Sequence, residues 1–537
     1  MIKDLDAQRP DTRVKSGVLI IGAGIAGLIL GYKLRQMGMR VVTLESGGRA
    51  QAEETHPLNA VVTVRSEYKG ASHGRARCLG GTSTRWGGAL LPFLPEDLEP
   101  RPHLKLPGWP LSLTELEPYI PELELLFALD KGSYDEAFAD SRRELAQLTT
   151  KPKDFLLRFA KWPTFKKRNL ANLFKQRIEA DPDWLVFLNA AASEFVVDVE
   201  TGRLRTVHAR VPGGSALTAE ADNVVICAGA IESTRLLLLM DRQHGGRIFE
   251  DCPALGCYFH DHVSAKAADI TTATPRQLNR LAGFRFVGST MRSLRFEIAP
   301  TAQQELGIGS AFGHISFQSI GHTGFDELRT FMRTLQQSGR VNARAGLSAL
   351  RDGPYLAKTA YWRFFHNQLR WPDAARYEFH IVAEQLPRVS NKIYLSDQID
   401  QNGVAIPAID WRVDTSDYST IRAFATAFDS YWRDHGLKHA GQFDWLPWLQ
   451  DGGDAVTANV EDVYHPGGTT RMGPDARSAV VDSRLRVFAV PNLWVASTST
   501  FPSGASANPT MMLALLVLRL ADELARTANS EASMSLS

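Results

Sequence analysis

The chain of 537 residues has no excess of charge and few cysteines. Lys and Arg total 60 against 59 Asp and Glu, so the formal net charge is +1. This balance argues against a general nucleic-acid binder, because counterion release needs a strongly basic surface. Four cysteines are too few for a disulfide scaffold, and no Cys/His spacing resembles a zinc site. We expect the four to be buried free thiols: Cys78, Cys227, Cys252 and Cys257.

Long hydrophobic runs are also missing. The longest apolar stretches, residues 18–21 and 511–517, are too short to cross a bilayer. The polar residues 1–16 lack the apolar core and the small-residue cleavage site of a secretory signal. These absences predict a cytoplasmic protein, or one on the cytoplasmic face of a membrane. With 44% hydrophobic and 22% charged residues, the composition is that of a globular chain of roughly two to four domains.

The sequence does contain a dinucleotide-binding motif near its start. A continuous apolar run at 18–21 predicts a buried parallel strand, and Gly22, Gly24 and Gly27 follow at once. Gly22 permits a tight turn, Gly24 lets the backbone approach a pyrophosphate, and Gly27 lets helix and strand pack closely. Residues 28–38 are expected to form the helix whose N-terminus faces the phosphates.

A second strand is predicted at residues 40–44, and it ends at Glu45. Glu45 lies 18 residues after Gly27, near the spacing at which an acid accepts hydrogen bonds from ribose hydroxyls. A carboxylate there would repel a 2′-phosphate, which argues against NADP. The motif by itself leaves both FAD and NAD open.

Further segments carry the same kind of signal. Residues 80–88 form a second glycine-rich stretch, which either binds an anion through its N–H groups or is a flexible loop; Trp86 argues against simple flexibility. An apolar run at 224–228 predicts another buried strand, followed by a turn and a helix. Near the end, residues 464–473 read YHPGGTTRMG, and residues 506–510 open a final apolar helix.

Taken together, these segments resemble the glucose–methanol–choline (GMC) oxidoreductases. The resemblance covers nearly the whole chain, with the motifs in order: VLIIGAGIAG, LGGTSTRWGG, VVICAGAIESTRLLL, LGCYFHDHV, EQLPRVSNKIYLSD, YHPGGTTRMG and ASANPT. In that family the ligand is FAD, which decides between the two dinucleotides. The pairing of HPGGTTRMG with ANPT looks most like the pyranose 2-oxidase and choline oxidase branches, which carry a His/Asn pair.

The resemblance implies an α/β (α+β overall) fold in two parts. A Rossmann-like FAD-binding domain is expected from the discontinuous segments 1–100, 200–265 and 460–537. A substrate-binding or cap domain, with an antiparallel sheet flanked by helices, is expected from 101–199 and 266–459. The predicted strands of that antiparallel sheet are residues 294–298, 313–317, 377–383, 392–395 and 406–411.

By resemblance, His465 is the base that takes the hydroxyl proton of an alcohol, while the hydride goes to the flavin N5. Asn508, 43 residues further on, is expected to donate its amide N–H to the alkoxide oxygen. The alternative for His465 is a buried histidine bonded to a carbonyl. Because Pro509 suits the first turn of a helix, Asn508 could instead be an N-cap.

The remaining site predictions concern the cofactor and the substrate pocket. FAD is expected to be non-covalent, because Arg85 replaces the flavin-linked histidine of pyranose 2-oxidase; His73 is an alternative anchor. Gln385 and Val463 are candidate substrate contacts. His260 and His262 invite a metal interpretation, but the resemblance places them at a structural turn, and no metal is predicted. The predicted cofactor-binding residues are Gly22, Gly24, Ile25, Ala26, Gly27, Glu45, Ser46, Arg77, Gly80, Gly81, Thr82, Ser83, Trp86, Gly87, Gly88, Val196, Ala228, Gly229, Ser233, Arg235, Ala496, Asn508, Pro509 and Thr510.

Two segments combine basic and aromatic residues, 151–175 and 329–376. One interpretation is a pair of solvated amphipathic helices, at a subunit contact or in solvent. The other is docking to an anionic membrane surface or to an anionic or lipid-linked substrate.

The sequence thus predicts FAD-dependent oxidation of an alcohol, most specifically a sugar or glycoside hydroxyl. The electron acceptor (oxygen, a quinone or a carrier) stays open, with a dehydrogenase favoured over an oxidase. Three alternatives remain: oxidation of a steroid or other apolar alcohol, a non-redox lyase of the same family, and a non-catalytic FAD-binding partner subunit.

Overall fold

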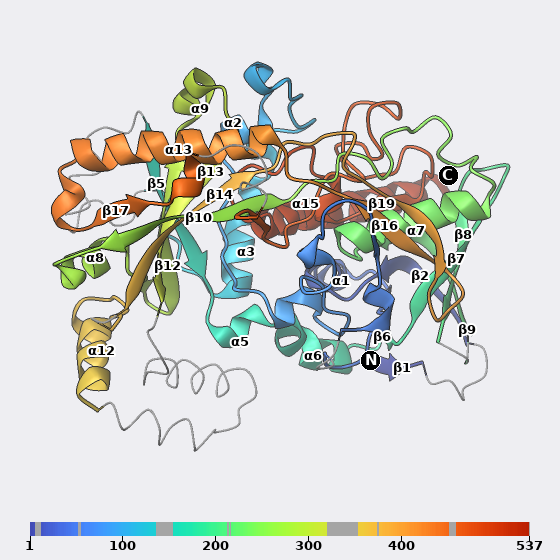
Figure 1. Ribbon diagram of the computed structural model, residues 1–537. Helices are drawn as coiled ribbons and strands as arrows, with labels where there is room; N and C mark the ends of the chain where they lie inside the picture. Colours follow the sequence, from blue (N-terminus) through green and yellow to red (C-terminus); the bar gives the residue numbers. More distant parts are fainter. Residues whose placement is uncertain are drawn as a thin grey trace.

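The computed structural model describes residues 1–537 except for 6–11, 52–54, 136–153, 212–213, 215, 319–352, 373–374, 451–457 and 536–537. Two large sheets lie on opposite sides of the molecule, with both chain termini beside the first of them (Figure 1). A sheet of three strands adds a smaller third element. The mixed α/β architecture with a Rossmann-like unit and a separate sheet-rich part confirms the predicted fold class.

The first sheet has eight strands in the order β1-β6-β3-β2-β9-β8-β7, with β19 paired to β9. The pairs from β1 to β9, and β9 with β19, are parallel, whereas β7, β8 and β9 pair antiparallel. The strand bounds are β1 Ile2–Asp4, β2 Thr12–Ile21, β3 Val41–Leu44, β6 Trp184–Leu188, β7 Ala191–Val197, β8 Leu204–Arg210, β9 Ala216–Ile226 and β19 Leu493–Val495.

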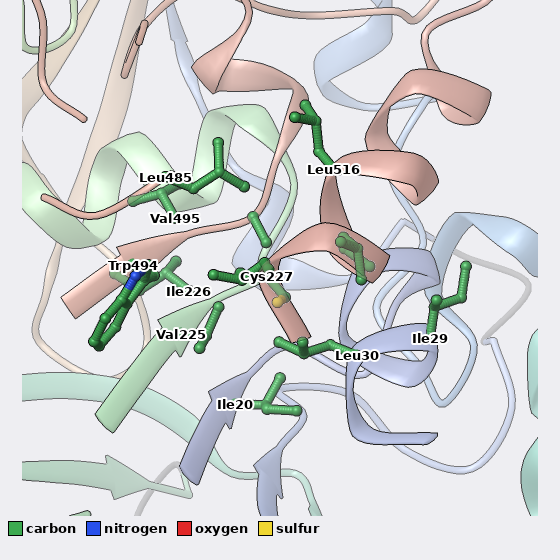
Figure 2. Packing of buried hydrophobic residues seen from close by; sticks show 14 of the residues in the cluster. Ile20, Ile29, Leu30, Val225, Ile226, Cys227, Leu485, Trp494, Val495 and Leu516 are labelled. Atoms are coloured by element: carbon green, nitrogen blue, oxygen red, sulfur yellow. The ribbon is translucent and has the colours of Figure 1, made fainter. Parts of the chain in front are cut away.

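Helices pack on this sheet because the parallel strands are apolar on both faces. Ile20 of β2 and Ile226 of β9 are fully buried between α1 (Ile25–Gln36), α7 (Ala230–Gln243) and α15 (Thr510–Ser535). Figure 2 shows Leu30 of α1 and Leu516 of α15 in this core, beside Val495 of β19. The strand–glycine loop–helix–strand unit predicted at the start of the chain is confirmed as β2, α1 and β3.

The second sheet is antiparallel, in the order β11-β12-β13-β14-β10-β17; β5 also pairs with β12, and β18 with β10. Helix α13 (Thr415–Asp434) covers one face, where Phe424 and Phe428 pack on Phe379 of β14. The strand bounds are β5 Phe155–Trp162, β10 His262–Thr271, β11 Arg285–Val287, β12 Thr290–Ile298, β13 Ala311–Gln318, β14 Arg376–Glu384, β17 Gln442–Trp445 and β18 Glu461–Asp462.

Two predictions about this part of the fold need correction. The strands expected at 392–395 and 406–411 exist, but β15 (Lys392–Ile399) and β16 (Ala405–Asp410) form the third sheet with β4 (Val62–Thr63). The prediction assigned 101–199 to the substrate domain, yet β6 and β7 pair inside the first sheet. That boundary is therefore too late in the chain, because β6 completes the parallel run beside β3.

The interpretation of residues 151–175 as a solvated amphipathic helix is wrong for residues 155–162, whereas 165–168 and 170–175 are helical. Residues 155–162 form β5, in which Arg158 and Lys161 are fully buried. Arg158 pairs with Glu297 and Asp135, and Lys161 pairs with Glu124. The charges of Arg158 and Lys161 are therefore internal ion pairs, whereas Lys166 and Lys175 of the same segment are exposed.

The second basic segment is described mainly from residue 353 onwards, and residues 329–352 lie outside the described part. Helix α12 (Gly353–Phe365) leaves Tyr361, Phe364 and Phe365 exposed. None of the helices among the described residues combines the length and apolar character needed to span a bilayer. The other helices of four or more residues are α2 Pro95–Leu98, α3 Ile120–Phe127, α5 Phe165–Arg168, α6 Leu170–Ala180, α8 Pro275–Ala282 and α9 Pro300–Leu306.

Candidate active site and cofactor site

The two glycine-rich segments of the sequence meet at the N-terminus of α1. The Gly80 amide donates a hydrogen bond of 2.9 Å to the Ala23 carbonyl. A Cβ atom added to Gly81 would lie 2.8 Å from Cα of Gly24. The first loop and the second are therefore packed backbone against backbone, beside the carboxyl ends of the parallel strands, where α/β folds bind nucleotides.

The glycines of the first loop are required for different reasons. Gly22 has a φ of +108°, and a Cβ there would lie 2.6 Å from the Cys227 carbonyl oxygen. A Cβ on Gly27 would lie 1.9 Å from the Gly22 carbonyl oxygen. Gly24 differs, because its φ is −81° and a Cβ would meet no atom within 4 Å. The protein's own packing does not demand glycine at 24, so the open space beside it fits a bound pyrophosphate.

Glu45 fixes the first loop against the end of β3. It is 5% exposed, and its carboxylate accepts hydrogen bonds from the amides of Ala23 (2.9 Å) and Gly47 (2.8 Å). Burial raises the pKa of Glu45, although these two hydrogen bonds and Arg77 act in the opposite direction. A carboxylate in this position holds the turn, and its contact with a ribose stays a prediction.

A cleft opens next to the first loop. Ion pairs line one wall, where Arg77 and Arg235 both bind Glu232, at 2.8 and 2.9 Å. Burial alone would raise the pKa of Glu232, but the two guanidinium groups hold it at about 2. The other walls are apolar or small: Ile21, Gly22, Leu44, Leu58, Ala190, Ala191, Ala192, Ala228, Leu236 and Val404. Mixed walls of this kind fit the adenosine half of a dinucleotide.

Five of the predicted cofactor residues line this cleft, namely Gly22, Ser46, Arg77, Ala228 and Arg235, whereas Val196 does not. Val196 lies 41% exposed on β7, and the part of the chain that lines the cleft there is 190–193. Ser83, by contrast, is buried and donates to the Gly80 carbonyl. Of the other predicted cofactor residues, Ile25 and Ala26 begin α1, and Gly229 precedes α7. The remaining residues differ in exposure: Ser233, Ala496, Pro509 and Gly88 are buried, Trp86 and Thr510 are half-buried, and Thr82 and Gly87 are exposed.

His465 and Asn508 lie side by side, 3.2 Å apart between Nε2 and Nδ2. Both side chains are half-buried, so they border an accessible space. The preceding residue, Tyr464, has a φ of +66°, a left-handed conformation that turns the chain sharply at this point. The Asp261 carboxylate accepts the His465 backbone amide at 2.8 and 3.0 Å, which holds the turn in place.

His262 fixes the tautomer of His465. Nε2 of His262 lies 2.7 Å from the Ala505 carbonyl and must donate to it, because a carbonyl only accepts. Nδ1 of a neutral His262 is then an acceptor, and it lies 2.9 Å from Nδ1 of His465. His465 therefore carries its proton on Nδ1 and presents the lone pair of Nε2 toward Asn508.

The electrostatic surroundings keep His465 neutral. Burial lowers its pKa well below the ordinary value, and His262 and Arg295 lower it further. Burial likewise lowers the pKa of His262. A neutral imidazole with a free Nε2 is the form that can accept a proton.

Among the described residues, the side chain of Asn508 forms no hydrogen bond that caps α15. Its Nδ2 meets His465, and its Oδ1 accepts a hydrogen bond from Arg295 of β12. The interpretation of Asn508 as an N-cap is therefore not supported. Sequence reasoning missed Arg295, which lies on a strand of the second sheet outside every motif, and it named His262 within LGCYFHDHV but gave it only a structural role.

The two candidate substrate residues fare differently. Gln385 is completely buried, with Nε2 donating to the Arg412 carbonyl and to Asp417, and Oε1 accepting from Trp411. Its side chain is saturated by structural contacts, so the prediction that it touches substrate is wrong. Val463 is half-buried and stays a candidate.

Asp261, His262 and His465 lie close enough for one ligand atom from each to surround a metal ion. The hydrogen bonds described above already occupy both ring nitrogens of His262. Asp261 accepts from the Tyr68 hydroxyl and from the backbone amides of His262 and His465. Hydrogen bonding accounts for the cluster without an ion, and no metal is part of the proposal below.

Comparisons with known proteins agree with this geometry. The family model for the GMC oxidoreductase matches residues 387–516, and one for an NAD(P)-binding Rossmann-like domain matches 20–65. The chain is 23% identical to the fructose dehydrogenase large subunit of Gluconobacter japonicus, over 95% of this chain and 97% of that protein. It is 22% identical to the 2-methyl-1,2-propanediol dehydrogenase of Mycolicibacterium austroafricanum, over 95% of each.

Among solved structures, an FAD-dependent oxidoreductase from Chaetomium thermophilum superimposes with a TM-score of 0.61 at 16% identity, covering 96% of this chain and all of that one. The GMC oxidoreductase match at residues 387–516 and the similarity of nearly the whole chain to these two dehydrogenases support membership of the GMC oxidoreductase family.

Proposed function

We propose that this chain oxidises a hydroxyl group of a sugar or glycoside to a carbonyl, with His465 as the general base and Asn508 positioning the oxygen. The observation that carries the proposal is the unprotonated Nε2 of His465, 3.2 Å from the amide nitrogen of Asn508. A hydroxyl placed against both atoms, in exchange for their mutual hydrogen bond, can give its proton to Nε2 and accept a hydrogen bond from the amide.

When bound, FAD supplies the hydride acceptor. The chain's own residues accept the hydroxyl proton of the substrate and stabilise its alkoxide oxygen. As the hydroxyl proton moves to Nε2 of His465, the imidazole becomes cationic and lies beside the developing alkoxide. The amide of Asn508 stabilises the same oxygen, and Arg295, bonded to the Asn508 carbonyl oxygen, fixes which end of the amide faces the substrate.

The sugar assignment rests on the resemblance to the pyranose 2-oxidase branch. It is also supported by the relative that is named a fructose dehydrogenase. Both curated relatives described above are named dehydrogenases, which favours an acceptor such as a quinone or a carrier over oxygen. The apolar-alcohol alternative would instead predict reduction of the flavin by sterols.

We further propose that FAD is held without a covalent bond. Arg85, at the position of the flavin-linked histidine of pyranose 2-oxidase, is exposed and cannot form that bond. His73, the alternative anchor, is exposed as well, and its Nδ1 contacts the Ser72 hydroxyl at 2.9 Å.

The decisive test is reduction of the flavin under anaerobic conditions, followed near 450 nm, with sugars, glycosides, polyols and sterols. We expect His465→Ala to slow reduction by at least ~10²-fold while FAD stays bound, in line with loss of a general base. His244→Ala, which removes a histidine at the C-terminal end of α7, is the matched control and should reduce normally. A change under threefold in His465→Ala would contradict the assignment of the base.

The alternatives predict other results in this assay. A lyase or a flavin-binding subunit without turnover would show no bleaching with any alcohol. Reduction by sterols and not by sugars would replace the sugar assignment and leave the base in place.

For the second basic segment, a peripheral contact with a membrane or another subunit is retained as a proposal. Tyr361, Phe364 and Phe365 of α12 are 52%, 76% and 73% exposed, a grouping of aromatics that a surface contact would explain. Sedimentation with anionic liposomes at low salt tests the membrane version, with the variant Phe364→Ser and Phe365→Ser as control. Absence of binding at low salt would rule it out.

A further inference from the structure

Arg295 is a buried cation beside the reacting groups. Its side chain extends from β12 and is 6% exposed. One guanidinium nitrogen, Nη2, donates to the Oδ1 of Asn508, and the guanidinium plane lies 4.2 Å from the centre of the Phe312 ring. The other nitrogen, Nη1, is buried and has no hydrogen-bond partner. A buried charged donor without a partner is costly, so its retention calls for a function.

The acids near Arg295 are already committed to other cations. Glu297, the next but one residue on the strand, binds Arg158 through Oε2 at 3.1 Å and accepts from the Ser506 hydroxyl through Oε1. Glu384 pairs with both terminal nitrogens of Arg101. Within the described part of the chain, no carboxylate forms an ion pair with Arg295.

The charge of Arg295 is nonetheless present at neutral pH. Burial lowers its pKa to about 10, with Arg158 acting in the same direction and Glu297 against it. Its cross-strand neighbours add no negative charge, because Arg158 lies opposite it on β5, and burial lowers the pKa of His314 on β13 to about 3. The site therefore holds a positive charge that the described residues leave uncompensated.

We propose that Arg295 binds a carboxylate carried by the substrate, so that the alcohol oxidised here is a hydroxy acid or a sugar acid. This proposal rests on the proposed function and narrows its substrate class. Arg295 extends from the second sheet, whereas the loops that fit the cofactor belong to the first sheet, so its free nitrogen lies on the substrate side.

The geometry limits the anion to one close to the hydroxyl. Nη2 of Arg295 meets one end of the Asn508 amide, and the other end of that amide faces His465. The carboxylate on Arg295 and the reacting oxygen on Asn508 would therefore be held by two neighbouring, hydrogen-bonded side chains. A single guanidinium with one unpartnered nitrogen matches a monoanionic carboxylate; a phosphate dianion would need further donors.

Matched pairs of alcohols test the proposal on the FAD-loaded enzyme. The pairs are lactate with lactamide and gluconate with glucose, each compared by anaerobic flavin reduction. Binding of acetate against acetamide, followed through the flavin absorption spectrum, gives a readout that requires no turnover. We expect the carboxylate of each pair to have a kcat/KM at least ~10-fold higher, and acetate to bind where acetamide does not.

The variants Arg295→Gln and Arg295→Lys separate charge from structure. Arg295→Gln should lower kcat/KM for every alcohol, because Arg295 also orients Asn508, but the loss should be at least ~10-fold larger for the acids than for their neutral partners, and Arg295→Lys should restore part of that difference. Arg376→Gln, at an exposed position on β14, removes the same unit of charge far from the site and should change neither.

Two results would overturn the proposal. One is a wild-type enzyme that prefers the neutral partner of each pair or fails to bind acetate. The other is an equal loss for acids and neutral alcohols in Arg295→Gln, which would mean that Arg295 acts only through Asn508 or on the flavin. If a neutral alcohol reduces the flavin and requires His465, the proposed function stands although the carboxylate is rejected; if no alcohol reduces it, the proposed function itself fails.

Discussion

His262 is predicted to control the protonation state of His465, and its replacement offers a sharp test. In the structure, Nδ1 of His262 accepts the proton of Nδ1 in His465, and this contact leaves Nε2 of His465 free to act as a base. Replacing His262 by Phe removes the acceptor and leaves a buried N–H unpaired. The tautomer with the proton on Nε2, which cannot accept another proton there, then gains population.

The magnitude follows from the single hydrogen bond at stake. An unsatisfied buried donor costs about 1–2 kcal/mol, so the reactive tautomer of His465 should become roughly 5- to 30-fold less favoured. The limiting rate of flavin reduction should fall by the same factor in His262→Phe. The loss is smaller than for His465→Ala, because the base itself is still present.

Substitutions that keep one half of His262 distinguish positioning from packing. In His262→Asn an amide oxygen can stand near the place of Nδ1, so the acceptor for His465 is retained and the rate should stay within threefold of wild type. In His262→Gln the amide reaches the place of Nε2 and can donate to the Ala505 carbonyl, but the acceptor is lost. We expect the Gln variant to behave like the Phe variant.

The assay is stopped-flow reduction under anaerobic conditions at several pH values. Because His262 lowers the pKa of His465, the acid limb of the rate profile should move to higher pH in His262→Phe. A merely structural role would not move that limb. Equal rates in the Asn and Phe variants, with no shift of the limb, would refute the reasoning about the tautomer.

Three further predictions concern the base and the cofactor. Because burial holds the pKa of His465 well below 6.5, the base is neutral at pH 7, so the wild-type limiting rate should be flat from pH 8 to 6.5 and fall only at lower pH; stopped-flow rates showing a limb at or above 6.5 would contradict this. Gly24→Ala should leave the melting temperature of the apoprotein within a few degrees of wild type and weaken FAD binding at least ~10-fold, whereas Gly27→Ala, whose Cβ would overlap the Gly22 carbonyl, should destabilise the apoprotein itself. Fluorescence titration measures the FAD affinity, and thermal unfolding measures the stability. Unchanged FAD affinity in Gly24→Ala would contradict the proposed fit of the pyrophosphate beside Gly24. Acid precipitation should release all the flavin into the supernatant, and a coloured pellet would point to a covalent bond.

The nucleotide-binding unit could be predicted because its information is local. An apolar strand, a glycine turn, a helix and a second strand all lie within residues 18–45, and the structure contains them as β2, α1 and β3. The same reasoning located the central strands of the second sheet, since their apolar alternation is also local. It could not assign β15 and β16 to their own sheet, because strand pairing depends on contacts between distant parts of the chain.

Charge was the signal that misled the sequence reading. Arg158 and Lys161 suggested a solvated surface because basic residues are rarely buried. Their partners, Glu297 and Glu124, lie 139 and 37 residues away, so no window of sequence could have shown that the charges are neutralised inside the protein.

In the active site, too, long-range contacts determine what the predicted residues can do. Motifs identified His465 and Asn508, but they gave no catalytic role to His262, which lies in the motif LGCYFHDHV, and none of them contains Arg295. His262 keeps the proton of His465 on Nδ1, so that Nε2 can act as the base. Arg295 binds Oδ1 of Asn508 and thereby orients its amide. A tautomer and an unpartnered charge depend on contacts between distant parts of the chain, here the packing of β10 and β12 against the C-terminal motifs, so local sequence could not reveal them.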